Sequence, residues 1–180
     1  MTELWLDITD IPATGREFSF SDPAIWTEPI AEFGLAHRLD ETGAPLEASF
    51  FVAPQGRGVL LRGRIVGAIV TPCDRCAEDA HVAVDSTFEL FEDIPLEGEE
   101  SVEPGLLRRR GKVVELDVAS LLWEQFLLAL PVKPLCEENC PGLCPRCGAN
   151  LREGPCSCTE EDADPRLAVF KTLKAPRGSN

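Results

Sequence analysis

The fold of this chain is set by residues 59–91, which read VLLRGRIVGAIVTPCDRCAEDAHVAVDSTFELF. The first part, Val59–Val70, is rich in β-branched residues and predicts a strand, whose two glycines indicate bulges or tight bends. The last part, His81–Phe91, alternates apolar and polar residues, the pattern of a strand with one buried face. We therefore expect a β-hairpin that carries Cys73 and Cys76 at or just beyond its end.

Shorter strands are expected before this hairpin and a helix after it. Glu17–Phe20 alternates in polarity, and Ala48–Val52 is a short apolar run. Residues 92–112 contain many acidic residues together with prolines and glycines, and are expected to form a loop. Asp117 is a candidate N-cap for an apolar, largely buried helix over about 117–130.

These elements predict an α+β fold in which a small curled antiparallel β-sheet packs with one long buried helix. We expect a β-rich domain over residues 1–135 and a zinc-binding, loop-rich segment over residues 136–180 that packs on the first part. That segment should end in a short helix, with Asp164 as its N-cap and Pro165 as its first residue.

The chain is strongly acidic, which excludes several classes of protein. Its 180 residues include 31 acidic and 17 basic ones, a formal charge of −14, and 11 of the acidic residues lie within 73–105. Such a chain repels nucleic acid except at a local basic patch. No apolar window is long enough for a membrane helix, and the acidic N-terminus does not resemble a signal peptide. We therefore expect a cytoplasmic protein with no membrane partner.

Eight cysteines form four close pairs, which in a reducing compartment indicate metal ligands rather than disulfides. The pairs are Cys73/Cys76, Cys136/Cys140, Cys144/Cys147 and Cys156/Cys158. Zinc binds four thiolates tetrahedrally, and a complete thiolate shell indicates a structural ion rather than a catalytic one. Two of the pairs resemble zinc knuckles, so we prefer zinc to an iron–sulfur cluster or a redox dithiol.

The spacing of the cysteines favours two zinc sites. The sequence CPRCG at 144–148 has the form of a zinc knuckle, and the last pair follows closely. The first site would therefore contain Cys144, Cys147, Cys156 and Cys158. By elimination, the second site would contain Cys73, Cys76, Cys136 and Cys140. The alternative places the 136/140 pair in the C-terminal cluster and leaves the 73/76 pair as a reduced dithiol, with one zinc ion per chain.

No familiar catalytic motif is present. The chain has no nucleophile elbow, phosphate-binding glycine loop or paired acid–base motif, so no small-molecule substrate is evident. His37 and His81 are isolated in sequence and are interpreted as surface or half-buried side chains. One dense basic run is a candidate RNA contact, consisting of Arg108, Arg109, Arg110 and Lys112. The alternative is that this run balances the acidic loop before it.

Several motifs resemble those of a known family. They are CDRC at 73–76, LALPVKPLC at 128–136, CPGLCPRCGANL at 140–151, GPCSC at 154–158 and DPRLAVFKTL at 164–173. In this order and spacing they resemble the YceD family, the large ribosomal RNA accumulation proteins, over residues 59–174. Some members of that family lack the knuckle pairs, which favours treating the last four cysteines as one site.

The resemblance implies a role in the synthesis, processing or stability of large-subunit rRNA, and no reaction. We expect a non-enzymatic ribosome-biogenesis factor that binds a ribosomal protein or a pre-ribosomal large subunit, with rRNA contact confined to a small patch. The acidic segment suits a basic protein partner. The alternative is an RNA-processing or thiol-redox enzyme that uses the zinc or dithiol sites.

Overall fold

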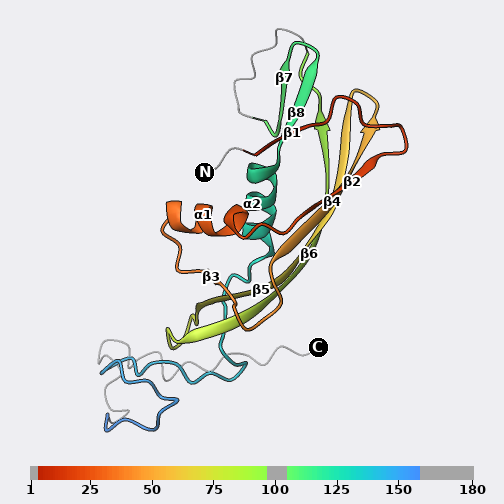
Figure 1. Ribbon diagram of the computed structural model, residues 1–180. Coiled ribbons are helices and arrows are strands. Elements are labelled where there is room, and N and C mark those ends of the chain that lie inside the picture. The colour runs from red at the N-terminus through yellow and green to blue at the C-terminus, as the bar shows by residue number, and fades with distance from the viewer. Residues whose placement is uncertain (1–3, 97–104, 159–180) are drawn as a thin grey trace, which may run out of the picture. The chain divides into compact units, whose positions relative to one another are not determined.

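The computed structural model describes residues 4–96 and 105–158. The chain divides into two compact units, Met1–Cys140 and Pro141–Asn180. Within the described residues, the named helices and strands all belong to the first unit (Figure 1). In chain order they are β1 (Trp5–Asp7), β2 (Arg16–Phe20), α1 (Ala24–Glu32), β3 (Arg38–Leu39), β4 (Glu47–Gln55), β5 (Gly58–Pro72), β6 (Asp79–Asp93), β7 (Leu107–Arg110), β8 (Val113–Asp117) and α2 (Val118–Ala129).

The expected hairpin is the centre of the first unit. Strands β5 and β6 are antiparallel and 15 residues each, and they pair without interruption from Gly58↔Asp93 to Pro72↔Asp79 (Figure 1). The alternation predicted from the sequence is seen in β6, where Val84 and Phe88 are buried and their neighbours are exposed. Because each residue of one strand opposes one of the other, most of the buried side chains of both strands lie on the same face of the hairpin.

The other strands of the main sheet extend the hairpin on the side of β5. The strand order is β2-β4-β5-β3, and β6 pairs with the opposite edge of β5. The predicted strands at 17–20 and 48–52 correspond to β2 and β4, which pair from Arg16↔Val52 to Phe20↔Ala48. The fold is therefore α+β with mostly antiparallel strands, as expected from the sequence.

Gly63 and Gly67 of β5 do not produce bulges, because the pairing register is continuous. A Cβ atom at Gly63 would lie 2.3 Å from the ring of Phe88. Gly67 has a φ of +145°, which favours glycine, and a Cβ there would lie 2.5 Å from the backbone of Leu46. Both positions therefore require glycine because another part of the same chain packs closely against β5, and not because a residue is inserted there.

Both helices lie on the same side of the main sheet and cover its apolar face (Figure 1). The Trp26 ring of α1 packs on Phe126 of α2 at 5.5 Å between centroids, and its Nε1 donates to the carbonyl of Leu46 at 3.1 Å. Leu61 and Ile65 of β5 are fully buried in the same core. Burial of these large apolar side chains is the main force that holds the helices to the sheet.

The helix after β8 begins where the sequence predicts. The Asp117 carboxylate accepts a hydrogen bond from the backbone N–H of Ser120 at 3.0 Å, the geometry of an N-cap. One long buried helix is not confirmed in that form, because α2 has 12 residues and leaves Leu127 and Leu128 exposed by 42% and 72%. A second helix, α1, was not expected because Pro29 lies inside it.

The expectation of a loop over residues 92–112 is wrong at both ends, because β6 continues to Asp93 and a further hairpin lies at the C-terminal end. There β7 forms a hairpin with β8, and β1 pairs with the other side of β8 to complete a three-stranded sheet. The hairpin turns at Gly111, whose φ of +62° suits glycine. The consecutive arginines of β7 conceal the apolar–polar alternation by which a strand is recognised. Residues 97–104 of the same stretch lie outside the described residues.

The second unit is described over residues 141–158, where turns surround four cysteines and one bridge joins Leu143 to Asn150. We expected the division of the chain after residue 135, whereas the first unit extends to Cys140. The short helix predicted from Asp164 lies outside the described residues. Neither helix of the described part of the chain is long and apolar enough to cross a lipid bilayer.

Candidate metal centres

The loop between β5 and β6 carries the first two cysteines at the end of the hairpin. Cys73 directly follows β5, and its backbone N–H donates to the carbonyl of Glu78 at 2.7 Å. The N–H of Ala77 donates back to the Cys73 carbonyl at 2.9 Å, and Ala77 has a positive φ of 60°. This tight loop turns the sulfurs of Cys73 and Cys76 inward, where both residues are buried.

The segment after α2 brings two more cysteines to this loop. The backbone N–H of Asp74 donates to the carbonyl of Pro134 at 2.8 Å. The Arg75 guanidinium donates to the carbonyl of Cys140, also at 2.8 Å. These two bonds hold the segment that contains Cys136 and Cys140 against the end of the hairpin. Residues at least 60 positions apart in the chain therefore share one small core.

The four sulfur atoms of this first cluster have the spacing of a metal site. Cys73 Sγ lies 3.9 Å from Cys140 Sγ, and Cys76 Sγ lies 3.6 Å from Cys136 Sγ. All four sulfurs lie within 4.8 Å of one another. A tetrahedral ion with Zn–S bonds of about 2.3 Å sets its sulfurs about 3.8 Å apart. The cysteines are not disulfide-bonded, so they fit a four-thiolate metal ion.

Backbone amides favour the thiolate form at this cluster. Burial opposes ionisation of Cys73, but hydrogen bonds from the backbone of Cys136, Arg75 and Cys76 outweigh burial and lower the pKa of Cys73 to about 6. The N–H of Arg75, for example, lies 3.5 Å from Cys73 Sγ. Because thiolates rather than thiols bind metal ions, these amides prepare the site for a cation.

The second cluster lies in the second unit and is built on a local turn. The N–H of Gly148 donates to the carbonyl of Cys144 at 2.9 Å, and Gly148 has a φ of +72°. The N–H of Cys144 in turn donates to the carbonyl of Ala149 at 2.8 Å. The four sulfurs, all within 4.8 Å of one another, belong to Cys144, Cys147, Cys156 and Cys158.

The electrostatics of the second cluster resemble those of the first. Hydrogen bonds from the backbone of Cys147 and Arg146 lower the pKa of Cys144 to about 6. A hydrogen bond to the Cys147 sulfur raises the pKa of Cys158 to about 12. Without a cation, this cluster therefore shares protons among its sulfurs, and a divalent ion would displace them.

The two clusters differ in burial. Cys73, Cys76 and Cys140 are only 3%, 2% and 2% exposed, whereas Cys147 of the second cluster is classed as exposed. The structure thus brings the eight cysteines together in the two groups of four that their spacing favoured, and the 73/76 pair is not left alone. Each group could hold one metal ion.

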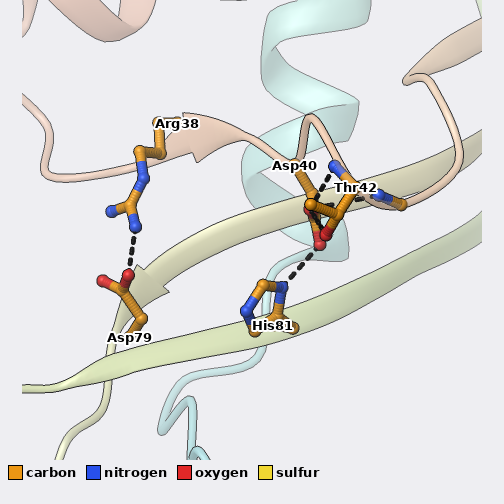
Figure 2. Close-up of polar contacts among 6 residues, drawn as sticks. Arg38, Asp40, Thr42, Asp79 and His81 are labelled. Carbon is orange, nitrogen blue, oxygen red and sulfur yellow. Dashed lines mark hydrogen bonds and ion pairs between the residues drawn. The ribbon is translucent and has the colours of Figure 1, made fainter.

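A polar network braces the hairpin near the first cluster, and sequence reasoning missed it. The buried Asp40 carboxylate follows β3, and His81 Nδ1 of β6 donates to it at 2.6 Å (Figure 2). The other carboxylate oxygen accepts from the N–H and the hydroxyl of Thr42 at 2.9 and 2.7 Å. Beside it, Arg38 of β3 pairs with Asp79, the first residue of β6 (Figure 2).

These contacts could not be found from spacing, because 41 residues separate Asp40 from His81. His81 was interpreted as a surface or half-buried histidine, and its side chain is 60% exposed. His37 is also close to this end of the sheet, where its Nδ1 is hydrogen-bonded to the hydroxyl of Thr71 at 2.8 Å and burial lowers its pKa. The network fixes β3 and the following turn to the hairpin end that carries Cys73.

Three of the four residues of the candidate RNA contact interact with other residues of the first unit. The Arg108 guanidinium lies 3.5 Å above the centroid of the Trp5 ring and donates to Glu115 at 2.8 Å. Arg109 donates to the carbonyl of Pro95 at 2.8 Å, and Arg110 lies 3.8 Å from Glu115. Lys112, at the turn of the β7–β8 hairpin, forms no ion pair with a described residue.

Comparisons with known proteins agree with the motifs. The family model described as "Large ribosomal RNA subunit accumulation protein YceD" matches residues 61–174. An uncharacterized protein of Mycobacterium tuberculosis is 31% identical over 149 residues, which cover 81% of this chain and 70% of the relative. An uncharacterized protein of Mycobacterium leprae is 28% identical over 150 residues, or 82% of this chain and 67% of the relative.

A plant protein is also similar to this chain. It is the Arabidopsis thaliana "Large ribosomal RNA subunit accumulation protein YCED homolog 1, chloroplastic", which is 24% identical over 158 residues. The aligned region covers 73% of this chain and 49% of the plant protein. No solved structure matches the chain.

Proposed function

The chain belongs to the YceD family, and from that premise we propose that it is a non-enzymatic ribosome-biogenesis factor that supports the synthesis, processing or stability of large-subunit rRNA. The family is named for accumulation of that RNA. The observation that carries the proposal is the extent of the match, because residues 61–174 include almost all of the β5–β6 hairpin, α2 and all eight cysteines. The match therefore covers both cysteine clusters and the central elements of the fold.

The partner is a basic ribosomal protein or a pre-ribosomal large-subunit particle. A chain with a formal charge of −14 attracts basic proteins and repels RNA over most of its surface. Most of the local basic run is already engaged, since Arg108 and Arg110 both lie near Glu115. Direct rRNA contact is therefore restricted to a small patch around Lys112.

Both cysteine clusters hold zinc in this proposal, and the ions are structural. An ion bound by all four sulfurs of a cluster would have a complete thiolate shell, which would leave no coordination position for a substrate or water. Zinc would supply cross-linking of chain segments and would lower the charge carried by the thiolates. The ligands would be Cys73, Cys76, Cys136 and Cys140 in one site and Cys144, Cys147, Cys156 and Cys158 in the other.

Sedimentation of the tagged protein from cell extract tests the proposal. At low salt we expect part of it to move with large-subunit precursor particles on a sucrose gradient, and depletion of the protein should lower the amount of large-subunit rRNA relative to small-subunit rRNA. The proposal fails if the protein stays at the top of the gradient at every salt concentration and depletion leaves the rRNA ratio unchanged.

The second candidate is an RNA-processing or thiol-redox enzyme that uses the first cluster. It is favoured by the lowered pKa of Cys73, a feature that reactive thiols share. Alanine replacement of Cys73 and Cys76 separates the two candidates. A structural site predicts loss of zinc together with loss of folding. Loss of rRNA accumulation with the fold and zinc content intact would instead support the enzyme.

A further inference from the structure

Strand β6 has one edge that no described strand pairs with. Its neighbour β5 occupies one side along all 15 residues, and β5 is itself central because β4 and β3 lie on its other side. Among the described residues, the opposite edge of β6 bonds to no strand. An edge of this length is unusual, since strands in globular proteins have about 3–10 residues.

Of the usual devices that protect a sheet edge, β6 has only charged side chains. Its sequence, DAHVAVDSTFELFED, has no lysine, proline or glycine, and its register contains no bulge. The charged residues are five carboxylates, which belong to Asp79, Asp85, Glu89, Glu92 and Asp93. A second copy of this chain is a poor occupant of the edge, because an antiparallel pairing of β6 with itself would bring carboxylates together from both strands.

On the solvent-exposed face of β6, arginines of the neighbouring strand β5 partly neutralise the carboxylates. Asp85 is paired with Arg64, and Glu89 is paired with Arg62. Both pairs are well exposed, so each contributes little to stability and its carboxylate can accept a further cation. An arriving strand would lie against β6 itself, where every charge is negative.

At one end of the edge, only part of the negative charge is paired among the described residues, because Arg57 lies 3.5 Å from Asp93 but no cation pairs with Glu92. Glu92 lies on the inner face of β6, near Glu124 of α2 and beside Asp93. Burial, and next the charges of Glu124 and Asp93, raise the pKa of Glu92. Glu92 and Glu124 form no hydrogen bond or ion pair with any described residue. Such a group of like charges is stabilised by an added cation.

We propose that the free edge of β6 is a docking site for an extended basic segment of a partner protein, which adds to the main sheet as a further strand. Main-chain hydrogen bonds to β6 would supply affinity, and lysine or arginine side chains near Glu92 and Glu124 would supply selectivity. This inference rests on the proposed function, since it names how a basic ribosomal partner would bind. RNA is excluded from this edge by its own negative charge.

A short synthetic peptide in which lysine and valine alternate is the direct probe. Its binding to the full chain is measured by fluorescence anisotropy, and hydrogen exchange locates the contact. We expect slower exchange of backbone amides within residues 79–93 when the peptide is bound. The control is the same peptide with alternate backbone nitrogens methylated, which keeps every charge but removes the N–H donors from one edge of the peptide. It should bind at least about tenfold more weakly.

Variants of the protein test whether the negative charge contributes to peptide binding. Glu92→Gln combined with Glu124→Gln removes unpaired charges and should not unfold the chain. We expect it to weaken peptide binding by about three- to thirtyfold, the range that two partly exposed charge pairs provide. The matched control, Glu28→Gln with Asp10→Asn, removes the same charge from exposed positions on α1 and in the loop after β1. It should leave binding nearly unchanged.

Four results would each overturn the inference. The first two are equal binding of the methylated peptide and protection that lies outside residues 79–93. The others are dimerisation of the chain through β6 in analytical ultracentrifugation, and protection of β6 by an oligouridine RNA rather than by the peptide. Sedimentation with large-subunit particles is a separate readout. If the chain sediments with them but the peptide fails to protect β6, the edge inference falls and the proposed function stands.

Discussion

At the scale of single residues, Asp40 is the buried carboxylate on which the β3–β6 brace depends. The hydrogen bond from His81, and next those from Thr42, hold the pKa of Asp40 well below its usual range. A carboxyl whose pKa is depressed by folding stabilises the protein above its unfolded pKa of about 3.9, and this stabilisation is lost as the pH falls towards the folded pKa.

We therefore predict that Asp40→Asn lowers the thermal midpoint at pH 7 and that the difference from the wild type shrinks below about pH 4. Thermal melts followed by circular dichroism between pH 3 and pH 7 measure the difference. The matched control is Glu41→Gln, at an exposed neighbouring position, which should melt like the wild type throughout. A difference that stays constant with pH would mean that the carboxylate charge does not stabilise the brace.

Gly63 is a second residue whose role is set by close contact. An added Cβ would lie 2.3 Å from the Phe88 ring and 2.8 Å from Phe50 Cβ. We predict that Gly63→Ala destabilises the fold by about 1–3 kcal/mol, the usual result of overpacking a core. Urea denaturation measures this. Adding Phe88→Leu should recover part of the loss, and Gly105→Ala, where the nearest atom lies at 3.9 Å, should have little effect. The explanation fails if the two glycine variants are equally stable.

At the scale of elements, α2 is positioned by its N-cap. The Asp117 carboxylate accepts hydrogen bonds from the N–H and the hydroxyl of Ser120 at 3.0 and 2.7 Å. We predict that Asp117→Ala lowers the free energy of unfolding by about 0.5–2 kcal/mol, whereas Asp117→Asn keeps most of it because asparagine is also a good N-cap. Chemical denaturation compares them. Equal losses in the two variants would show that the cap does not act through its hydrogen bond.

The elements also show which parts of the fold a sequence reveals. The β5–β6 hairpin and α2 are predictable from local sequence, because β6 alternates apolar and polar residues, β5 is rich in β-branched residues, and α2 is an apolar run that follows the N-cap Asp117. Strand β7 was missed because consecutive arginines hide its alternation, and α1 was missed because Pro29 interrupts its pattern. Local spacing predicted the grouping of the last four cysteines, whereas the grouping of the first four followed only by elimination. The partnership of Asp40 with His81 depends on the folded sheet, so spacing does not reveal it.

At the scale of the whole molecule, the two clusters should contribute differently to stability. The first cluster ties the hairpin end to the segment after α2 within one buried core, whereas the second closes a local turn. A cross-link between distant segments restricts the unfolded chain more than a local one does. Loss of the first ion site should therefore destabilise the first unit, and loss of the second should not.

We predict two zinc ions per chain and a different response of each to substitution. Cys76→Ser and Cys147→Ser should each retain one ion by mass spectrometry under native conditions. Only Cys76→Ser should lower the thermal midpoint of the near-ultraviolet signal from tryptophan, because Trp5, Trp26 and Trp123 all lie in the first unit. A weak chelator should remove one ion first, from the cluster whose Cys147 is exposed. One ion in the wild type, or equal thermal midpoints of the two variants, would contradict this prediction. In that case, neither the burial of a cluster nor the distance along the sequence between its cysteines would determine which cluster stabilises the fold.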